Sequence, residues 1–194
     1  MRLSALAALA TLAIPAFAEK PAPELRKAPE FEFVEGSGKK SLLSQYRGKV
    51  CVVEFMFTTC PHCQQTSVMY QRIYNDLKGK GFQMLAVAFN EPVSPMMVNQ
   101  FQGQFGVTFP VGIGQRETVM NFLGIPPMAL DWVVPQIVVI DKKGMIRAQS
   151  ERKGTAQLQE DPYMRNFIES LLKEGTAASS SGSKKAPAPA KKSS

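Results

Sequence analysis

The sequence predicts an α/β fold, in which one sheet has helices on both faces. Two observations support this prediction. Between residues 50 and 123, apolar runs of strand length alternate with segments whose apolar residues recur at helical spacing. From residue 136 the order changes to a strand, a tight turn, a second strand and a last helix. Alternation followed by a hairpin is typical of a mixed sheet covered by helices. The chain shows no internal repeat and no sign of a second folded domain.

The first elements come before the alternating region. Phe31 and Phe33 alternate with glutamates, a pattern that predicts a half-buried strand. Glycines at 36 and 38 then turn the chain. Residues 42–46 predict a short helical turn. Residues 50–57 are almost all apolar, and this predicts a buried strand.

The middle of the chain supplies the alternating units. Apolar residues at helical spacing predict a helix over 64–78, and an apolar run predicts a strand over 82–89. Ser94 is a good cap for a helix that has Pro95 in its first turn and ends near residue 105. A short strand over 109–111 and a short helix over 118–123 follow.

The last third begins with an irregular loop over 126–132. Strands over 136–140 and 145–149 flank the turn at 141–144, which predicts a hairpin. Asp161 and Pro162 are expected to cap the last helix. Its apolar face consists of Met164, Phe167, Ile168, Leu171 and Leu172.

The two ends differ from the folded region in composition. Residues 1–18 carry Arg2, an apolar stretch and the sequence Ala16-Phe17-Ala18, which predicts a cleaved signal peptide. An uncleaved anchor is the alternative, although the stretch is short for a membrane span. Residues 19–174 are expected to form the domain. Residues 175–194 contain no large apolar side chain, which predicts a disordered tail. We therefore expect export, to the bacterial periplasm, where disulfides persist.

The net charge of +7 does not indicate a nucleic-acid partner. Five of the 23 basic residues lie in the signal segment and the tail, leaving 18 basic against 16 acidic residues elsewhere. No basic stripe interleaved with aromatic residues is present, so nucleic-acid binding is not expected.

Cys60 and Cys63 form the motif that carries chemistry. They lie two residues apart where the strand over 50–57 meets the following helix. The unpaired N–H groups and the dipole at a helix start stabilise an anion, and the thiolate is the nucleophile of disulfide exchange. We therefore expect Cys60 to attack and Cys63 to resolve, with Pro61 and His62 between them.

Other interpretations of this motif need residues that the chain lacks. A structural zinc site requires a second ligand pair, but the only other cysteine is Cys51 and the only histidine is His62. A c-type haem requires histidine at position 64, which is glutamine. A static disulfide across two residues closes too small a loop to stabilise much. No metal or cofactor is expected, and Cys51 is expected to be a buried, inert thiol.

The order of these parts resembles the thioredoxin-like redoxins of the TlpA/ResA type, within the AhpC/TSA-redoxin superfamily. The resemblance covers residues 28–173. It rests on Ala28-Pro29-Glu30-Phe31, Tyr46-Arg47-Gly48-Lys49, the CxxC pair, Val107-Thr108-Phe109-Pro110, and Val134-Pro135 before the strand over 136–140. It implies a thioredoxin fold with a central mixed sheet of four or five strands flanked by helices. It also implies an N-terminal hairpin and the helix–strand insertion that peroxiredoxins share.

The active-site residues resemble the DsbA pattern instead. These are Val53-Glu54-Phe55, the Cys60-Pro61-His62-Cys63 motif preceded by Thr59, and Val134 before Pro135. A lone acid on an apolar strand is expected to have a raised pKa. The resemblance implies that Glu54 exchanges a proton with Cys63.

Three further roles are expected around the motif. By the same resemblance Pro135 is a cis-proline packed against the CxxC pair, which leaves the Val134 backbone free to pair with a substrate strand. We expect His62 to donate toward the Cys60 sulfur, which favours the reduced form and makes the disulfide more oxidising.

The expected function is an extracytoplasmic thiol–disulfide oxidoreductase acting on cysteine-containing client proteins, with a membrane or soluble redox partner. The CPHC motif favours an oxidase or isomerase, and a TlpA/ResA-like reductase, as in cytochrome c maturation, is the alternative. A peroxiredoxin requires Pro and Thr at the positions of Val53 and Phe57. A Sco-like copper protein normally spaces its cysteines by three residues and adds a distant histidine. Met128, Leu130 and Trp132 are either an apolar lip for extended substrates or part of the core.

Overall fold

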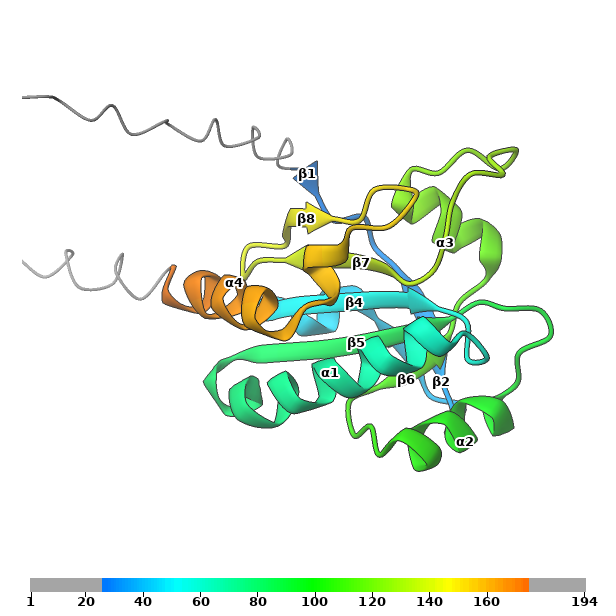
Figure 1. Cartoon of the computed structure of the whole chain (residues 1–194), viewed down its shortest axis with the longest axis horizontal. Helices are drawn as coiled ribbons and strands as arrows, with labels where there is room; N and C mark the ends of the chain where they lie inside the picture. Colours follow the sequence, from blue (N-terminus) through cyan, green and yellow to red (C-terminus); the bar gives the residue numbers. More distant parts are fainter. Residues whose placement is uncertain (1–25, 175–194) are drawn as a thin grey trace, which may run out of the picture.

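One eight-stranded mixed sheet organises the molecule, which a computed structural model describes over residues 26–174. The predicted signal segment 1–18 and tail 175–194 lie outside the described residues. The strand order is β1-β8-β7-β4-β5-β6-β2-β3 (Figure 1). The strands are β1 Arg26–Lys27, β2 Glu32–Glu35, β3 Lys40–Leu42, β4 Val50–Met56, β5 Phe82–Ala88, β6 Val111–Ile113, β7 Gln136–Ile140 and β8 Met145–Gln149.

The centre of the sheet carries the site. Strand β4 pairs in parallel with β5 and antiparallel with β7, and all seven residues of β4 are buried. The N-terminal segment extends the sheet at both edges, since β1 pairs with β8 while the β2–β3 hairpin joins β6. The expected N-terminal hairpin is therefore present. The sheet is wider than four or five strands because this segment adds three short ones.

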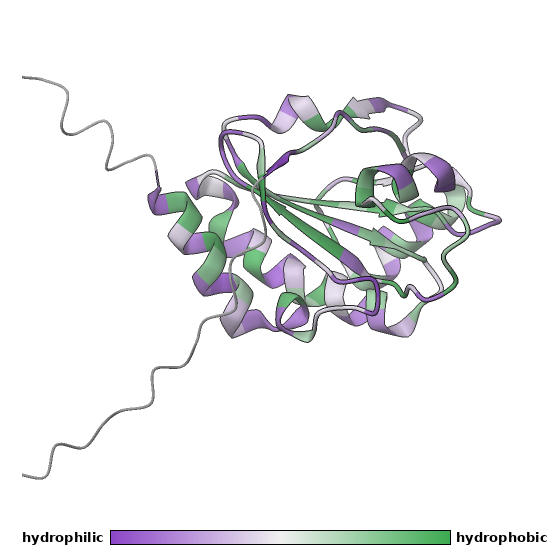
Figure 2. Ribbon diagram, turned by 90° about the horizontal axis from the view of Figure 1, so that it is seen from above, coloured by the Kyte–Doolittle hydropathy of each residue, from purple (hydrophilic) through white to green (hydrophobic). Residues whose placement is uncertain are grey.

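Four helices cover the two faces of the sheet. They are α1 Pro61–Leu77, α2 Pro95–Phe105, α3 Arg116–Leu123 and α4 Asp161–Lys173. Helices α1, α2 and α4 contribute to one hydrophobic core, and α3 contributes to the core on the other face. The apolar strands lie between these layers (Figure 2). Within residues 26–174 no helix is long and apolar enough to cross a membrane.

Local signals explain where the helices begin and end. The Ser94 side chain accepts from the Met97 N–H at the start of α2, and Gly106 ends this helix in the left-handed region. Pro61 occupies the first turn of α1, where no intrahelical donor is needed, so this helix begins directly after Cys60, as expected, and three residues before the apolar spacing that starts at position 64.

Three other expected boundaries are corrected. Helix α3 starts at Arg116 rather than 118. Strand β6 is Val111–Ile113 instead of 109–111, because Pro110 has no N–H to donate and contributes only its carbonyl, which accepts from Ala86. Asp161 lies inside α4, where it pairs with Arg165, and Glu160 holds the N-cap position without a side-chain cap.

Candidate active site at the start of helix α1

Cys60 is the N-cap residue of α1. Its N–H donates to the Phe57 carbonyl at 3.1 Å, and its carbonyl accepts from Gln64 N at 3.0 Å. The side chain is half-buried and lies against the α1 core. The Cys60 side chain makes no capping hydrogen bond to the first turn of α1, so its sulfur is not tied to the helix backbone.

The turn that leads into Cys60 is held by side chains from two other segments. The Thr58 N–H and hydroxyl both donate to Asn90 Oδ1, at 3.1 and 3.4 Å. Gln64 Nε2 donates to the Thr58 carbonyl at 2.9 Å. Sequence reasoning missed Asn90 and Gln64. Gln64 follows the CxxC pair directly, but nothing in the sequence shows that Asn90 lies beside Thr58.

The Val134–Pro135 segment lies beside Cys60. This peptide bond is cis, and Cys60 Sγ is 4.0 Å from the Val134 carbonyl oxygen. Among the described residues, no hydrogen bond uses the Val134 N–H. This backbone is therefore an unpaired edge next to the sulfur.

Gln136 fixes the segment that carries this edge. Its Nε2 donates to the Val133 carbonyl at 2.7 Å and to the carbonyls of Glu151 and Arg152 at 3.2 Å. The Val133 N–H also donates to the Arg152 carbonyl, at 2.8 Å. Sequence reasoning missed Gln136, because the sequence shows it only as the first residue of an apolar strand.

Cys63 and Glu54 are both buried beneath Cys60. Burial raises the pKa of the Cys63 thiol well above its usual value, and the Glu54 charge and the Cys60 hydrogen bond raise it further. Glu54 is fully buried on β4. Its pKa is raised to about 8 by burial, against the opposing effect of the Ser67 hydroxyl. Near neutral pH the carboxyl can therefore hold or release a proton, which a surface glutamate cannot do.

Pro61 and His62 are exposed at the start of α1. His62 lines a groove together with Val133–Pro135 and residues 153–156. Within residues 26–174, no hydrogen bond joins the His62 imidazole to Cys60. His62 is exposed in this groove, and its expected donation to the Cys60 sulfur is not seen.

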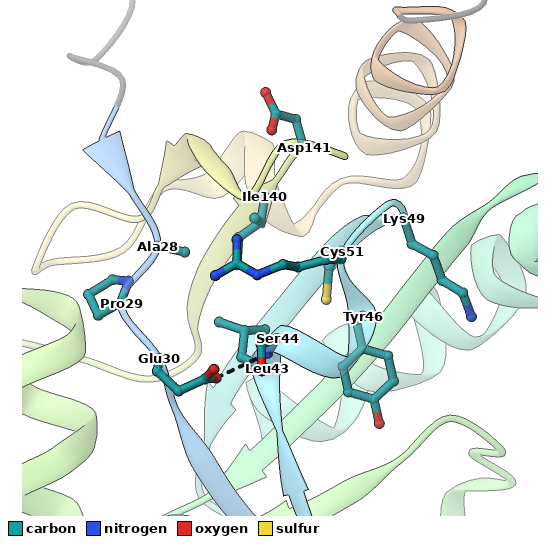
Figure 3. A pocket seen from close by; sticks show the side chains of 12 residues that line it. Ala28, Pro29, Glu30, Leu43, Ser44, Tyr46, Lys49, Cys51, Ile140 and Asp141 are labelled. Carbon is teal, nitrogen blue, oxygen red and sulfur yellow. Dashed lines mark hydrogen bonds between the residues drawn. The ribbon is translucent and has the colours of Figure 1, made fainter.

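Cys51 lies on the opposite face of β4, away from the Cys60–Cys63 pair. It belongs to the α3 core, whereas Cys63 belongs to the α1 core. Burial raises its pKa to about 12, slightly opposed by Lys49. Cys51 lines a small pocket with Ala28, Leu43 and Ile140 (Figure 3).

The loop before Val134 divides into exposed and packed residues. Met128 and Leu130 are 88% and 96% exposed. Trp132 is partly buried and stacks on Phe89, with ring centroids 5.8 Å apart, and the Arg116 guanidinium lies 5.0 Å above the indole. Met128 and Leu130 are therefore not part of the core, while Trp132 packs with Phe57 and Phe89.

Metal ligation is one of the alternatives to thiol chemistry that the sequence leaves open. Over the described part of the chain, no group of three or more His, Cys, Asp and Glu side chains is placed to hold a metal ion. The arrangement that is present, a half-exposed sulfur above a buried sulfur and a buried acid, suits thiol exchange.

Solved structures share this arrangement of elements. The thioredoxin domain of a thiol-disulfide oxidoreductase from Bacteroides vulgatus matches with a TM-score of 0.60 and 20% identity, covering 76% of this chain and 96% of that one. A thioredoxin-family thiol:disulfide interchange protein from Chlorobium tepidum matches with a TM-score of 0.62 and 21% identity, covering 80% and 99%. At these identities the likeness shows the fold alone, which is the thioredoxin fold.

Sequence relatives point the same way. The thiol-disulfide oxidoreductase ResA of Geobacillus thermodenitrificans is 32% identical over 120 residues, and the alignment covers 62% of this chain and 64% of the relative. ResA of Bacillus anthracis is 29% identical over 134 residues, covering 69% and 73%. The chain thus matches slightly less than two thirds of the first relative's length. A sequence model of the AhpC/TSA family matches residues 25–149, more than half of the chain, and the chain therefore belongs to the AhpC/TSA family.

Proposed function

We propose that this chain is a thiol–disulfide oxidoreductase that exchanges a Cys60–Cys63 disulfide with cysteines of client proteins. The observation that carries the proposal is the increasing burial of three reactive groups at the start of α1. A half-exposed sulfur lies at the helix start, a buried sulfur lies one turn inside, and a fully buried carboxyl lies near the second sulfur. The ResA relatives, which are named for this activity, support it.

The two cysteines have different tasks in the exchange. In the oxidising direction, a client thiolate attacks Cys60 Sγ, and the sulfur of Cys63 leaves as a thiolate. Glu54 gives its proton to that thiolate, so that the negative charge left by cleavage of the disulfide moves from the Cys63 sulfur to the carboxyl. A second client thiolate then attacks the client sulfur of the mixed disulfide, which releases Cys60 as a thiolate and leaves the client with a disulfide.

The reducing direction uses the same atoms in reverse order. The Cys60 thiolate attacks a client disulfide, and one client sulfur leaves as a thiolate that takes a proton from water. Cys63 loses its proton to the Glu54 carboxylate and attacks Cys60 Sγ. The Cys60–Cys63 disulfide forms as the second client sulfur leaves. Since burial raises the pKa of Cys63, a nearby base is needed at this step.

Client binding is proposed at the backbone of Val134. The unpaired edge beside Cys60 suits an extended segment that adds as a short strand, because backbone hydrogen bonds do not depend on the client sequence. Pro61 and His62 are exposed, and His62 lines the same groove as Val134, so both would border that segment. Pro135 follows Val134 and is buried.

Two observations favour different directions of electron flow. The Cys60-Pro61-His62-Cys63 motif with Val134 favours an oxidase or isomerase. The resemblance of the whole chain to the TlpA/ResA type favours a reductase, as in cytochrome c maturation, with electrons supplied by a redox partner. We take the oxidase or isomerase as the leading proposal, because the residues next to the reacting sulfur set its potential.

The reduction potential of the Cys60–Cys63 couple distinguishes them. The protein is equilibrated with glutathione and dithiothreitol buffers, and its dithiol fraction is counted by thiol alkylation and mass spectrometry. A Cys51→Ala variant keeps the third thiol out of the count. A potential above roughly −200 mV supports the oxidase or isomerase, and one below roughly −250 mV supports the reductase. A pair that never reaches reversible equilibrium contradicts both.

The compartment is part of the same proposal. Residues 1–18 have the pattern of an export signal, and disulfides of client proteins form and persist in oxidising compartments. A membrane-impermeant maleimide applied to intact cells is expected to label reduced Cys60. Labelling only after lysis would contradict a periplasmic location.

A further inference from the structure

The two oxygens of the Glu54 carboxyl have different surroundings. Oε2 accepts a hydrogen bond from the Ser67 hydroxyl at 2.6 Å. Oε1 is buried and has no partner among the described residues. Ser67 is fully buried on α1, four residues after Cys63 and on the same face of the helix.

The other elements that pack around Glu54 offer few polar groups. On the sheet, its neighbours in the ladders are Ala86 of β5 and Ile137 of β7. On α1, the titratable groups that sense its charge are Cys63 and Tyr70. The residues that α4 buries against this core are Met164, Ile168 and Leu171.

Tyr70 does not compete with Ser67 for the carboxyl. Its hydroxyl donates to the Leu158 carbonyl at 2.7 Å. No ion pair joins Glu54 to a cation anywhere in residues 26–174. The Ser67 hydroxyl is therefore the one hydrogen-bond donor to this carboxyl in the described structure.

Ser67 donates its hydroxyl proton to an unusual acceptor for a helical serine. A helical serine commonly donates its single hydroxyl proton to a carbonyl one turn earlier. Here the proton goes to a carboxyl on the neighbouring strand instead. A donor on Oε2 favours the charged carboxylate, and it leaves Oε1 as the oxygen that can take up a proton.

We propose that Ser67 is a positioning residue for Glu54, holding Oε2 so that Oε1 exchanges the proton with Cys63. The expected change in the acidity of Glu54 follows from the hydrogen bond alone. The expected change in the rate of disulfide exchange rests on the proposed function. Removing the hydroxyl is expected to make Glu54 a weaker acid and to let the carboxyl rotate.

The first test follows Glu54 directly and needs no activity. Glutamate is labelled with ¹³C at the carboxyl carbon, and the reduced protein is titrated between pH 5 and pH 10 by NMR. Glu54→Gln identifies the Glu54 signal. In Ser67→Ala the acid dissociation constant of Glu54 is expected to fall by about tenfold, since hydrogen bonds to charged groups are the strong ones.

Thr66 provides a matched control on the same helix. It is also buried, and its hydroxyl lies 3.4 Å from Gln159 Oε1. Thr66→Ala removes a hydroxyl at the neighbouring position and is expected to leave the Glu54 midpoint unchanged. Ser67→Thr keeps a hydroxyl and is expected to return the midpoint toward that of the unmodified chain. An unchanged midpoint in Ser67→Ala overturns the proposal.

The second test measures the pH profile of disulfide exchange with a peptide client. The midpoint of the rate profile of Ser67→Ala is expected to move to higher pH, to a proton concentration about tenfold lower than in the unmodified chain. A moved Glu54 midpoint with an unmoved exchange profile overturns the role in exchange. If the unmodified chain exchanges no disulfide at any pH, the proposed function fails, while the NMR titration still decides whether Ser67 holds Glu54.

Discussion

Cys51 and Cys63 are buried thiols on opposite faces of the same sheet, and they differ in what surrounds them. Both have their pKa raised first of all by burial. Cys51 lies in the α3 core, where Phe31, Phe55 and Phe122 form an aromatic cluster with ring centroids 5.3–5.5 Å apart. Cys63 lies in the core that contains Glu54.

Burial without a nearby proton carrier is expected to leave a thiol inert. A buried thiolate is costly, so Cys51 stays protonated over the physiological range. Cys63 is buried as deeply, but the nearby Glu54 carboxyl has a pKa of about 8 and can exchange a proton near neutral pH. Cys63 also lies next to Cys60, whose sulfur is half-exposed. We therefore expect a proton carrier and a path to the surface to distinguish the proposed reactive pair from a structural thiol.

The strongest test of this comparison replaces one thiol at a time. Cys60→Ser is expected to abolish exchange with a disulfide client, since a serine hydroxyl is not ionised at neutral pH. Cys51→Ser is expected to change the rate by no more than about twofold, although a hydroxyl in an apolar core destabilises the fold. Rates are read from reduction of a fluorescent disulfide peptide. A tenfold loss in Cys51→Ser would place Cys51 in the exchange.

Substitutions in the α3 core are expected to lower the free energy of unfolding without changing the rate of disulfide exchange. Phe55→Ala removes a fully buried ring from the aromatic cluster and is expected to cost about 4 kcal/mol of unfolding free energy. Urea unfolding measures this cost. The rate of exchange at a temperature where the variant is folded is expected to stay within about twofold. A large loss of rate in a folded variant would mean that the two faces are coupled.

The α1 face should instead respond to pH. The folded-state pKa of Glu54 is about 8, raised by burial from an ordinary value of 4.5. The folded protein therefore holds a proton that the unfolded chain has released, and stability falls as pH rises between these values. On the order of 3 kcal/mol should be lost between pH 5 and pH 8.

Glu54→Gln keeps the shape of the side chain and removes the titration. Its unfolding free energy is expected to lack this part of the pH dependence, so the difference from the unmodified chain should grow with pH. Thr66→Ala serves again as the control, because it keeps Glu54 and its unfolding free energy is expected to depend on pH as that of the unmodified chain does. Parallel stability curves for Glu54→Gln and the unmodified chain would show that Glu54 does not titrate in this window.

The smallest expected effect on stability lies in the loop before Val134. Leu130 is 96% exposed, so Leu130→Ser is expected to change the unfolding free energy by less than about 0.5 kcal/mol. If the loop is a lip for extended clients, the same variant should raise KM for an apolar peptide client. Its reaction with dithiothreitol should be unaffected. Equal KM values for the peptide would assign this loop no part in client binding.

Most of the fold and the centre of the site follow from local patterns. The runs that form β4, β5 and β7 are apolar over their whole length, as buried strands are. Cys60 and Cys63 are evident from spacing. Glu54 stands out as the one acid in a buried strand.

The supporting residues do not follow from the sequence, because they act across segments that are far apart in it. Asn90 holds Thr58 over 32 positions, and Gln136 holds a turn 16 positions away. Both are ordinary amides until the fold brings them into contact. Ser67 is an intermediate case, since a serine four residues after Cys63 on an apolar helix face is a visible signal.

The contact between Cys60 and Val134 joins residues 74 positions apart, and this separation has a consequence for folding. The sulfur and the first turn of α1 form from neighbouring residues, whereas the edge for clients exists only after β7 has paired with β4. Pairing over such a distance is slow compared with helix formation. A newly made chain is therefore expected to form the helix start at Cys60, the proposed nucleophile, before it forms the proposed client-binding edge at Val134.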